Sequence, residues 1–214
     1  DESKIVIVRN GIDLDILNIE KIDIKKKYNI DSFILFLGRF NKVKGIDVLI
    51  NAINLIKNHS EFKKTQLLIM GVDFGYEKEM LRLIDEYKLQ DKIKVVKNPS
   101  RKEVISAYNE SEFLVLPSRW ELSPLTPLEG FAFKKPVISS NVHGIPYTVI
   151  HNVNGILIEP ENHNELANAI TGLLADKDKC LAYGNAGYHL VDSICNSTIM
   201  SKEILKVYEK TINR

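Results

Sequence analysis

Short apolar runs alternate with longer amphipathic stretches along most of this chain. Several of the runs are apolar almost throughout, which is typical of parallel strands whose two faces are both covered by helices. We expect strands at residues 5–8, 33–37, 66–70, 93–96, 113–116, 136–138 and 155–158. The alternation predicts an α/β fold with a doubly wound, mostly parallel sheet. Such sheets bind ligands beyond the carboxyl ends of their strands, so the loops at those ends are the candidate sites.

The stretches between the apolar runs have the spacing of amphipathic helices. One of them places its large apolar side chains on a single face: Ile46, Leu49, Ile50, Ile53 and Ile56. A second helix is expected over residues 77–87, and others begin near Ser100, Thr126 and Leu166. From about residue 176 onward the pattern is helical only. We therefore expect a helical tail, packed either on this sheet or on a neighbouring domain.

Composition narrows the classes of protein to which the chain can belong. Its 214 residues, of which 44% are hydrophobic, suit one α/β domain with a sizeable core. The 29 Lys+Arg and 28 Asp+Glu residues nearly cancel, so the chain as a whole has no electrostatic preference for nucleic acid. The two cysteines and five histidines lack metal-ligand spacing, which argues against a metal site.

The sequence contains no targeting or membrane-spanning pattern. No apolar run approaches the ~20 residues that a membrane-spanning helix needs, and two unpatterned cysteines are typical of a reducing compartment. We therefore expect a cytoplasmic protein, with its parent either free or peripheral at the membrane. The sequence opens on Asp1 rather than on a Met, so we also expect a preceding region.

A basic loop bounded by Gly38 and Gly45 follows the second expected strand. Arg39, Lys42 and Lys44 gather there at an expected helix N-terminus, where the helix dipole disfavours positive charge. A bound anion resolves this conflict, since backbone N–H groups and cationic side chains can converge on a phosphate. The loop therefore predicts a phosphate site, and the alternative is a basic turn with its side chains in water.

A proline-rich loop at the end of another strand carries two acidic residues, Glu121 and Glu129. Thr126, Pro127 and Glu129 have the spacing of a helix start, with Thr as the N-cap, Pro first and Glu third. Glu129 therefore has a structural role that competes with a functional one. Glu121 has no such local role, and it is either a surface charge or an acceptor of hydrogen bonds from ligand hydroxyls. The free N–H groups of the helix start are candidates for a further anionic part of the ligand.

The order of these motifs resembles the C-terminal domain of retaining GT-B glycosyltransferases of family 4, the glycosyl transferases group 1. The resemblance covers nearly the whole chain, and Glu121 and Glu129 carry it with seven residues between them. The other motifs are Asn10-Gly11-Ile12-Asp13, Gly38-Arg39, Lys44-Gly45, Pro117-Ser118, Pro136-Val137-Ile138, Gly144-Ile145-Pro146 and Asn154-Gly155-Ile156-Leu157. It implies that residues 1–214 form a Rossmann-like, nucleotide-sugar-binding domain, the C-terminal half of a GT-B fold.

The resemblance also implies catalytic roles for Arg39, Lys44 and Glu121. After the turn at Gly38, Arg39 and Lys44 would hold the donor diphosphate and stabilise the charge that develops on the leaving group. Glu121 would bind hydroxyls of the donor sugar. The donor would be a UDP- or GDP-sugar, and a hexosyl transfer that retains the anomeric configuration would need neither a metal nor another cofactor.

The remaining implied contacts belong to the nucleotide. Glu129 would accept hydrogen bonds from the ribose diol, and the backbone N–H groups of Leu125 and Thr126 would support the phosphates. The sequence departs from the common pattern at Leu122-Ser123-Pro124, where the family often has Gly-Phe-Gly. Pro124 has no N–H, so one phosphate contact of the family is lost there.

The resemblance implies that the chain is part of a larger enzyme. GT-B enzymes place the acceptor site in an N-terminal domain that this sequence lacks, so we expect the isolated chain to show little or no transfer. The acceptor would be a saccharide or a lipid-linked saccharide. Three alternatives remain open: a non-catalytic nucleotide-sugar-binding module, a GT-B nucleotide-sugar epimerase domain, and a flavodoxin-like interaction domain that needs neither glutamate.

Overall fold

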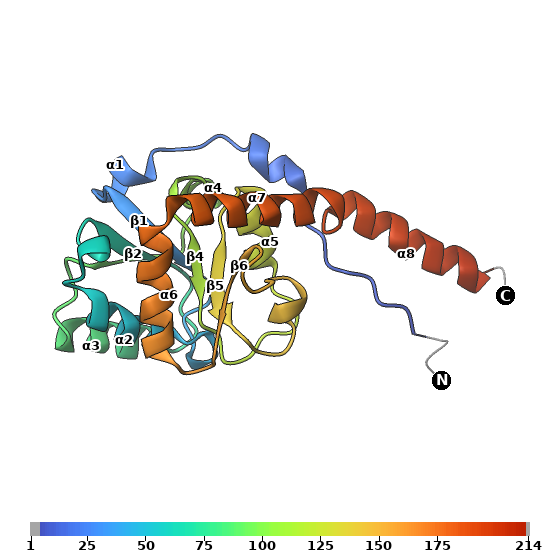
Figure 1. Cartoon of the computed structure of the whole chain (residues 1–214). Coiled ribbons are helices and arrows are strands. Elements are labelled where there is room, and N and C mark those ends of the chain that lie inside the picture. The colour runs from blue at the N-terminus through green and yellow to red at the C-terminus, as the bar shows by residue number, and fades with distance from the viewer. Residues whose placement is uncertain (1–4, 213–214) are drawn as a thin grey trace.

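A six-stranded, all-parallel sheet forms the centre of the computed structural model, which describes residues 5–212 (Figure 1). The strands are β1 (Ser32–Leu37), β2 (Thr65–Gly71), β3 (Ile93–Lys97), β4 (Leu114–Leu116), β5 (Val137–Ser140) and β6 (Gly155–Ile158). They lie in the order β3-β2-β1-β4-β5-β6. The prediction of a doubly wound, parallel sheet is therefore confirmed. The chain builds the sheet outward from β1 to β3, then crosses back to place β4 on the other side of β1.

Helices cover both faces of the sheet, and their contacts divide them into groups. Helix α2 (Ile46–Ile56) packs against α3 (Glu77–Glu86) and α6 (His163–Ala175), whereas α1 (Ile24–Tyr28) packs against α4 (Arg101–Glu110). Helix α5 (Leu125–Ala132) packs against α7 (Lys177–Ser193). The five helices expected from apolar spacing are all present, with starts within about three residues of the predicted ones.

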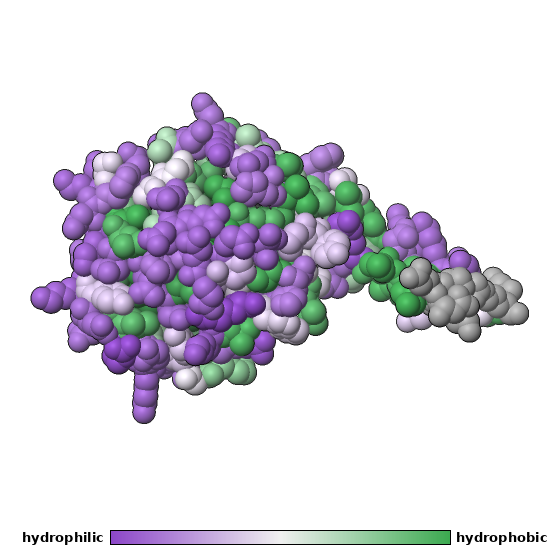
Figure 2. Space-filling view, turned by 60° about the horizontal axis from the view of Figure 1, so that its bottom comes forward, coloured by the Kyte–Doolittle hydropathy of each residue, from purple (hydrophilic) through white to green (hydrophobic). Residues whose placement is uncertain are grey.

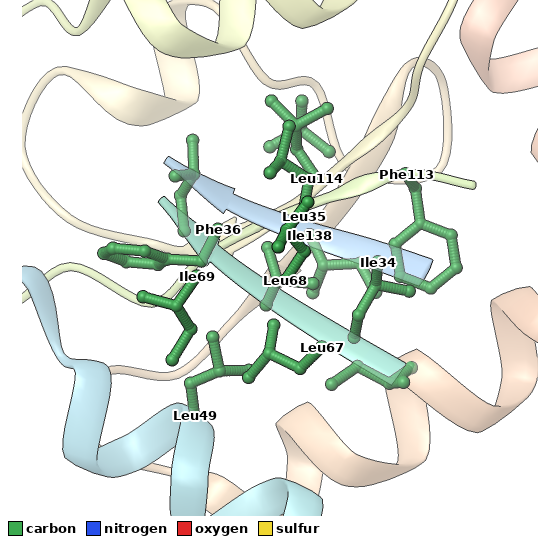
Figure 3. Close-up of a cluster of buried hydrophobic side chains, with 14 of the residues drawn as sticks. Ile34, Leu35, Phe36, Leu49, Leu67, Leu68, Ile69, Phe113, Leu114 and Ile138 are labelled. Carbon is green, nitrogen blue, oxygen red and sulfur yellow. The ribbon is translucent and has the colours of Figure 1, made fainter. Parts of the chain in front are cut away.

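The inner strands are buried in the core and support the loops at their carboxyl ends. Ile34, Leu35 and Phe36 of β1 are fully buried, and Figure 3 shows them beside Leu68 of β2 and Leu114 of β4. Leu35 pairs in register with both Leu68 and Leu114, which fixes the relative height of the three strand ends. Burial on both faces explains why these strands read as continuous apolar runs.

The strand expected at residues 5–8 does not form. These residues have no regular secondary structure, and Ile5 and Ile7 are 70% and 89% exposed. The segment runs away from the sheet, as Figure 1 shows in dark blue, so no neighbouring strand offers it a hydrogen-bonding edge. β-Branched residues favour strands only where such an edge and a packing surface exist, and the prediction was wrong for that reason.

The turn motif at Gly11 packs against the junction between α7 and α8 (Ser197–Ile212). The amide of Ile12 donates to Cys195 O at 3.0 Å, and the amide of Ser197 donates to Ile12 O at 2.8 Å. A Cβ on Gly11 would lie 2.3 Å from Asn196 O, so only glycine permits this approach. The N-terminal segment is thereby tied to the start of the last helix.

The helical tail has two different parts. Helix α7 packs on α5, but α8 (Ser197–Ile212) has no buried residue and extends away from the sheet (Figure 1). Its exposed apolar side chains include Leu205, Tyr208 and Ile212. Figure 2 shows a group of apolar side chains, in green, where the projecting part of the molecule leaves the body. Of the two alternatives for the helical tail, packing on this sheet or on a neighbouring domain, the first therefore holds for α7.

Candidate functional site

The two loops singled out by the sequence lie next to each other at the carboxyl edge of the sheet. One follows β1 and the other follows β4, and these two strands are neighbours. The strand order reverses between them, because β1 leads outward to β2 while β4 leads outward to β5 in the other direction. Doubly wound sheets bind ligands at such a switch point, and the region between these two loops is called the crevice below.

Gly45 holds the first loop against the second. Its φ of 65° is left-handed, and a Cβ there would lie 1.9 Å from Pro117 O. A one-turn helix, η3 (Lys42–Lys44), precedes Gly45, and the Asn41 side chain caps it by accepting from the Lys44 amide at 3.1 Å. Lys42 and Lys44 therefore lie on a separate turn just before α2, which begins at Ile46 directly after Gly45, as expected. The first turn of α2 carries the acidic Asp47, the charge that a helix N-terminus favours.

Lys44 and Glu121 meet across the crevice. Their side chains form an ion pair and are only 18% and 16% exposed. Ser118 Oγ donates to the same Glu121 oxygen, Oε1, at 3.2 Å. All hydrogen bonds that Glu121 makes through its carboxylate within residues 5–212 go to Oε1, which leaves Oε2 able to accept from a ligand.

Arg39 lies on the rim of the crevice, exposed to solvent. Its guanidinium carbon is 5.2 Å from the centroid of the Phe74 ring, which belongs to the loop after β2. This cation–π contact holds the arginine over the neighbouring loop while its N–H donors remain free to turn. The amide of Gly38, just before it, donates to Met70 O at 3.1 Å and so ends β1 as part of the sheet.

The expected capping box at Glu129 does not form. Helix α5 begins at Leu125 with Pro124 as its N-cap, so Thr126 is the second helical residue and Glu129 the fifth. Proline fits anywhere in the first turn, where no intrahelical N–H bond is made, so Pro127 does not define the helix start. The amides of Leu125 and Thr126 consequently stand free in the first turn, with no acceptor among residues 5–212.

Glu129 is held by two side chains of α4. Its Oε2 accepts a hydrogen bond of 2.7 Å from the Tyr108 hydroxyl, and its Oε1 pairs with Arg101 at 3.1 Å. Arg101 begins α4 directly after β3, so Glu129 also lies at the carboxyl edge of the sheet. The carboxylate is 19% exposed and thus reachable from solvent.

Arg119 fastens four segments around the crevice, and sequence reasoning missed it. Its guanidinium pairs with Asp47 through bonds of 2.8 and 2.7 Å and also pairs with Glu161. It donates to Lys42 O as well, and its own amide donates to Val43 O at 2.7 Å. Burial pushes the pKa of Asp47 upward, but the hydrogen bonds and charge of Arg119 outweigh this and lower it. The pair thus fixes the η3 turn relative to the loop after β4.

The loop that carries Glu121 also packs on the loop after β5. The amide of Gly144 donates to Glu121 O at 3.0 Å, and a Cβ on Gly144 would lie 1.3 Å from Leu122 O. On the other side, Asn10 Nδ2 donates to Ser123 Oγ at 2.9 Å. A cavity of about 460 Å³ lies between these segments, lined by residues that include Asn10, Leu122, Ser123 and Tyr147.

Residues 18–190 match the model described as "Glycosyl transferases group 1". The chain belongs to this family.

Three relatives illustrate what this group 1 glycosyltransferase domain is similar to. An uncharacterized glycosyltransferase, MJ1178 of Methanocaldococcus jannaschii, is 32% identical over 87% of this chain and 48% of its own length. A glycosyltransferase structure from Rickettsia africae has a TM-score of 0.89 and 27% identity, over 99% of this chain and 58% of its own. The C-terminal domain of a group 1 family protein, LpcC of Francisella tularensis, has a TM-score of 0.74 and 21% identity. That match spans 87% of this chain and all of the LpcC domain.

These comparisons fix the fold of the domain as well. The chain spans about half the length of the curated relatives it matches, and its fold is that of one Rossmann-like half of a GT-B glycosyltransferase. Within residues 5–212, no three His, Cys, Asp or Glu side chains cluster as a metal site requires. No helix in this part of the chain has the length and hydropathy to cross a membrane.

Exposed apolar side chains surround the crevice of this glycosyltransferase domain. They lie on the loops after four strands: Val43, Phe74, Trp120, Leu122, Leu125 and Tyr147. Sequence reasoning found the charged residues of these loops but did not identify the apolar rim. The signal was available, because an apolar residue in a loop beyond a strand end has no core to enter.

Proposed function

We propose that this chain is the donor-binding half of a retaining glycosyltransferase. In this proposal the enzyme transfers a hexosyl group from a nucleoside diphosphate sugar to an acceptor hydroxyl. The observation that carries it is the meeting of Lys44 and Glu121 at the switch point of the sheet, where a cation suited to a phosphate and a carboxylate suited to sugar hydroxyls stand side by side. The ion pair also joins the two loops, and it leaves donors of Lys44 and the second oxygen of Glu121 available to a ligand.

The phosphates would lie between the η3 turn and the start of α5. Lys44 has three N–H donors, so it can keep its bond to Glu121 and also donate to a phosphate oxygen. The free amides of Leu125 and Thr126 add two donors at the positive end of a helix, which favours an anion. Arg39 can turn in from the rim, because stacking on Phe74 leaves its N–H groups available.

The sugar would lie against Glu121 and the ribose against Glu129. Glu121 Oε2 is available to accept hydrogen bonds from sugar hydroxyls, and a carboxylate makes stronger bonds to such donors than a neutral acceptor does. Glu129 lies on α5, after the loop that carries Glu121, and offers a second acceptor at the edge of the sheet. The two glutamates would thus orient opposite ends of the donor.

In the proposed reaction the bond between the anomeric carbon and the donor phosphate breaks. The acceptor oxygen forms its bond on the same face of the sugar, and its proton passes to the departing phosphate oxygen. Lys44 and Arg39 would stabilise the negative charge that gathers on the diphosphate as this happens, so their effect would be larger in the transition state than in the bound donor. No metal or cofactor enters this scheme.

We further propose that an acceptor-binding domain closes over the apolar rim. Six exposed apolar side chains surround the crevice, more than a polar ligand alone would explain. The exposed apolar side chains of α8 would pack on the same domain. The acceptor would be a saccharide or a lipid-linked saccharide, and the present chain alone would hold a donor without transferring its sugar.

Calorimetric titration with UDP, GDP and their hexose derivatives tests the proposal. The wild-type chain is expected to bind one nucleotide series, and Arg39→Ala is expected to weaken that binding about tenfold through loss of a charge-assisted contact. Arg82→Ala is the matched control, because within residues 5–212 Arg82 pairs only with Glu79 and Glu86 on the exposed face of α3. Absence of binding to any of these compounds at millimolar concentration, or an equal loss in both variants, would refute the proposal.

A further inference from the structure

A fully buried tyrosine hydroxyl lies behind the carboxylate of Glu129. Tyr108 is 0% exposed, and its hydroxyl donates to Glu129 Oε2 at 2.7 Å. Its ring stacks on Phe133, with centroids 5.8 Å apart and planes inclined by 7°. This packing fixes the ring, so the direction of the O–H donor is set by the core and not by the loop conformation.

The Tyr108 hydroxyl is a permanent donor. Burial raises its pKa well above the usual range, and the charge of Glu129 raises it further. The hydroxyl is therefore protonated at neutral pH, and it donates to the Glu129 carboxylate. A neutral donor that is fully buried and aimed at a charged acceptor makes one of the stronger hydrogen bonds a protein offers.

The bond decides which oxygen of Glu129 faces a ligand. Because Tyr108 occupies Oε2, the carboxylate presents Oε1 on its exposed side, where Arg101 contacts it at 3.1 Å. Arg101 is itself 51% exposed and can move. Oε1 has capacity for a further hydrogen bond, since a carboxylate oxygen accepts more than one.

We infer that Tyr108 is a positioning residue for the ribose of the donor nucleotide. This inference rests on the proposed function, in which Glu129 accepts hydrogen bonds from the ribose diol. Tyr108 does not touch the nucleotide; it holds the carboxylate so that Oε1 receives the ribose hydroxyls. Without the phenolic hydroxyl the carboxylate would rotate among orientations, and part of the ribose contact would be lost in most of them.

The test compares nucleotides that have the two ribose hydroxyls with nucleotides that lack them. The variants change one functional group of Tyr108 or Glu129. Wild type, Tyr108→Phe and Glu129→Gln are titrated with UDP and GDP, and then with the 2′,3′-dideoxy form of the nucleotide that binds. We expect Tyr108→Phe to weaken binding of the ribonucleotide about tenfold and to change binding of the dideoxynucleotide less than about twofold. In a Glu129→Gln background, adding Tyr108→Phe is expected to cause a much smaller further loss, because the two residues act through one contact.

Tyr28→Phe is the matched control, and thermal unfolding of every variant checks that it folds. Tyr28 also donates to a glutamate of α4, Glu103, but belongs to a contact outside the crevice, so its removal is expected to leave both affinities unchanged. Equal losses for the ribonucleotide and its dideoxy form would reduce Tyr108 to a structural residue and overturn the inference, as would an unchanged ribonucleotide affinity. Failure of the wild type to bind UDP and GDP would instead overturn the proposed function, and the inference with it.

Discussion

At the scale of single residues, the crevice is built from charged contacts between segments that are distant in sequence. Lys44 and Glu121 join the loops after β1 and β4, and Arg119 joins Asp47 to Glu161. Each of these side chains is partly shielded from water, except Glu161, which is 56% exposed. Removing one partner of a shielded pair leaves the other charge without compensation away from water, so such a substitution has measurable consequences.

Glu121→Gln tests the sugar contact. Glutamine keeps the shape of the side chain but loses the charge that strengthens bonds to sugar hydroxyls. We expect the variant to bind the free nucleoside diphosphate at least as well as wild type, because Lys44 is released toward the phosphate, and to lose about tenfold in affinity for the nucleotide sugar. Calorimetry with both ligands measures the difference. Glu112→Gln, whose carboxylate accepts from Ser32 at the opposite edge, is the control, and a parallel loss there would contradict the assignment.

Asp47→Asn tests the Arg119 pair through its pH dependence. The pKa of Asp47 is lowered in the folded protein, so its charged form stabilises the fold above the ordinary aspartate pKa of about 4. That contribution is lost as the pH falls through the folded pKa. We expect Asp47→Asn to reduce the free energy of unfolding by about 1–2 kcal/mol at pH 7, discounted for partial exposure. Urea unfolding of wild type and variant at pH 7 and pH 3 should show a smaller difference in the free energy of unfolding at pH 3. An equal difference at both pH values would contradict the prediction.

At the scale of secondary-structure elements, two close approaches set the positions of the loops. Gly45 brings the start of α2 against Pro117, and Gly144 brings the loop after β5 against Leu122. In both places a backbone carbonyl occupies the space where a Cβ would lie. The elements are therefore held by backbone contacts that a side chain of any size would disrupt.

Gly45→Ala is expected to destabilise the domain by more than about 2 kcal/mol. The loss combines the strain of a left-handed residue with the clash against Pro117 O at 1.9 Å. Gly75→Ala separates the two causes, because Gly75 also has a positive φ, of 87°, but a Cβ there meets no atom within 4 Å. It should cost only about 1 kcal/mol. Chemical denaturation of both variants measures this, and equal losses would contradict the role of the close approach.

Much of the architecture was predictable because its signals are local. The pattern of a buried parallel strand or of an amphipathic helix can be recognised within a few residues. The order of the motifs also predicted that Lys44 and Glu121 lie at strand ends. The strand predicted at residues 5–8 does not form, because these residues have the composition of a strand but no neighbouring strand edge. The helix start predicted at Thr126 was wrong because Pro127 suits any position in the first turn of a helix. Tyr108 and Arg119 were missed because their partners lie 21 and 72 positions away, and no local pattern reports such distances.

At the scale of the whole molecule, the domain has surfaces that it does not use itself. Helix α8 extends from the body without a buried residue, and the apolar rim surrounds the crevice. The C-terminal part of α8 extends away from the sheet (Figure 1), and in the proposed function it packs on the acceptor-binding domain.

Ending the chain after Lys202 should therefore leave the stability of the domain nearly unchanged. The removed part of α8 contributes no buried side chain, and segments without buried contacts contribute little to the free energy of unfolding. We expect the midpoint of thermal unfolding to change by less than about 2 °C. Calorimetry of the shortened and full chains measures the change, and a much larger fall would show that α8 stabilises this domain directly.

The central claim is that a nucleoside diphosphate binds at the switch point between β1 and β4. Backbone amide shifts measured by NMR during titration with UDP and GDP test it most directly. We predict that the largest shifts occur at residues 38–45 and at the free amides of Leu125 and Thr126. Shifts confined to the opposite edge of the sheet, around the cavity lined by Ser32 and Cys180, or no shifts at millimolar nucleotide, would contradict it.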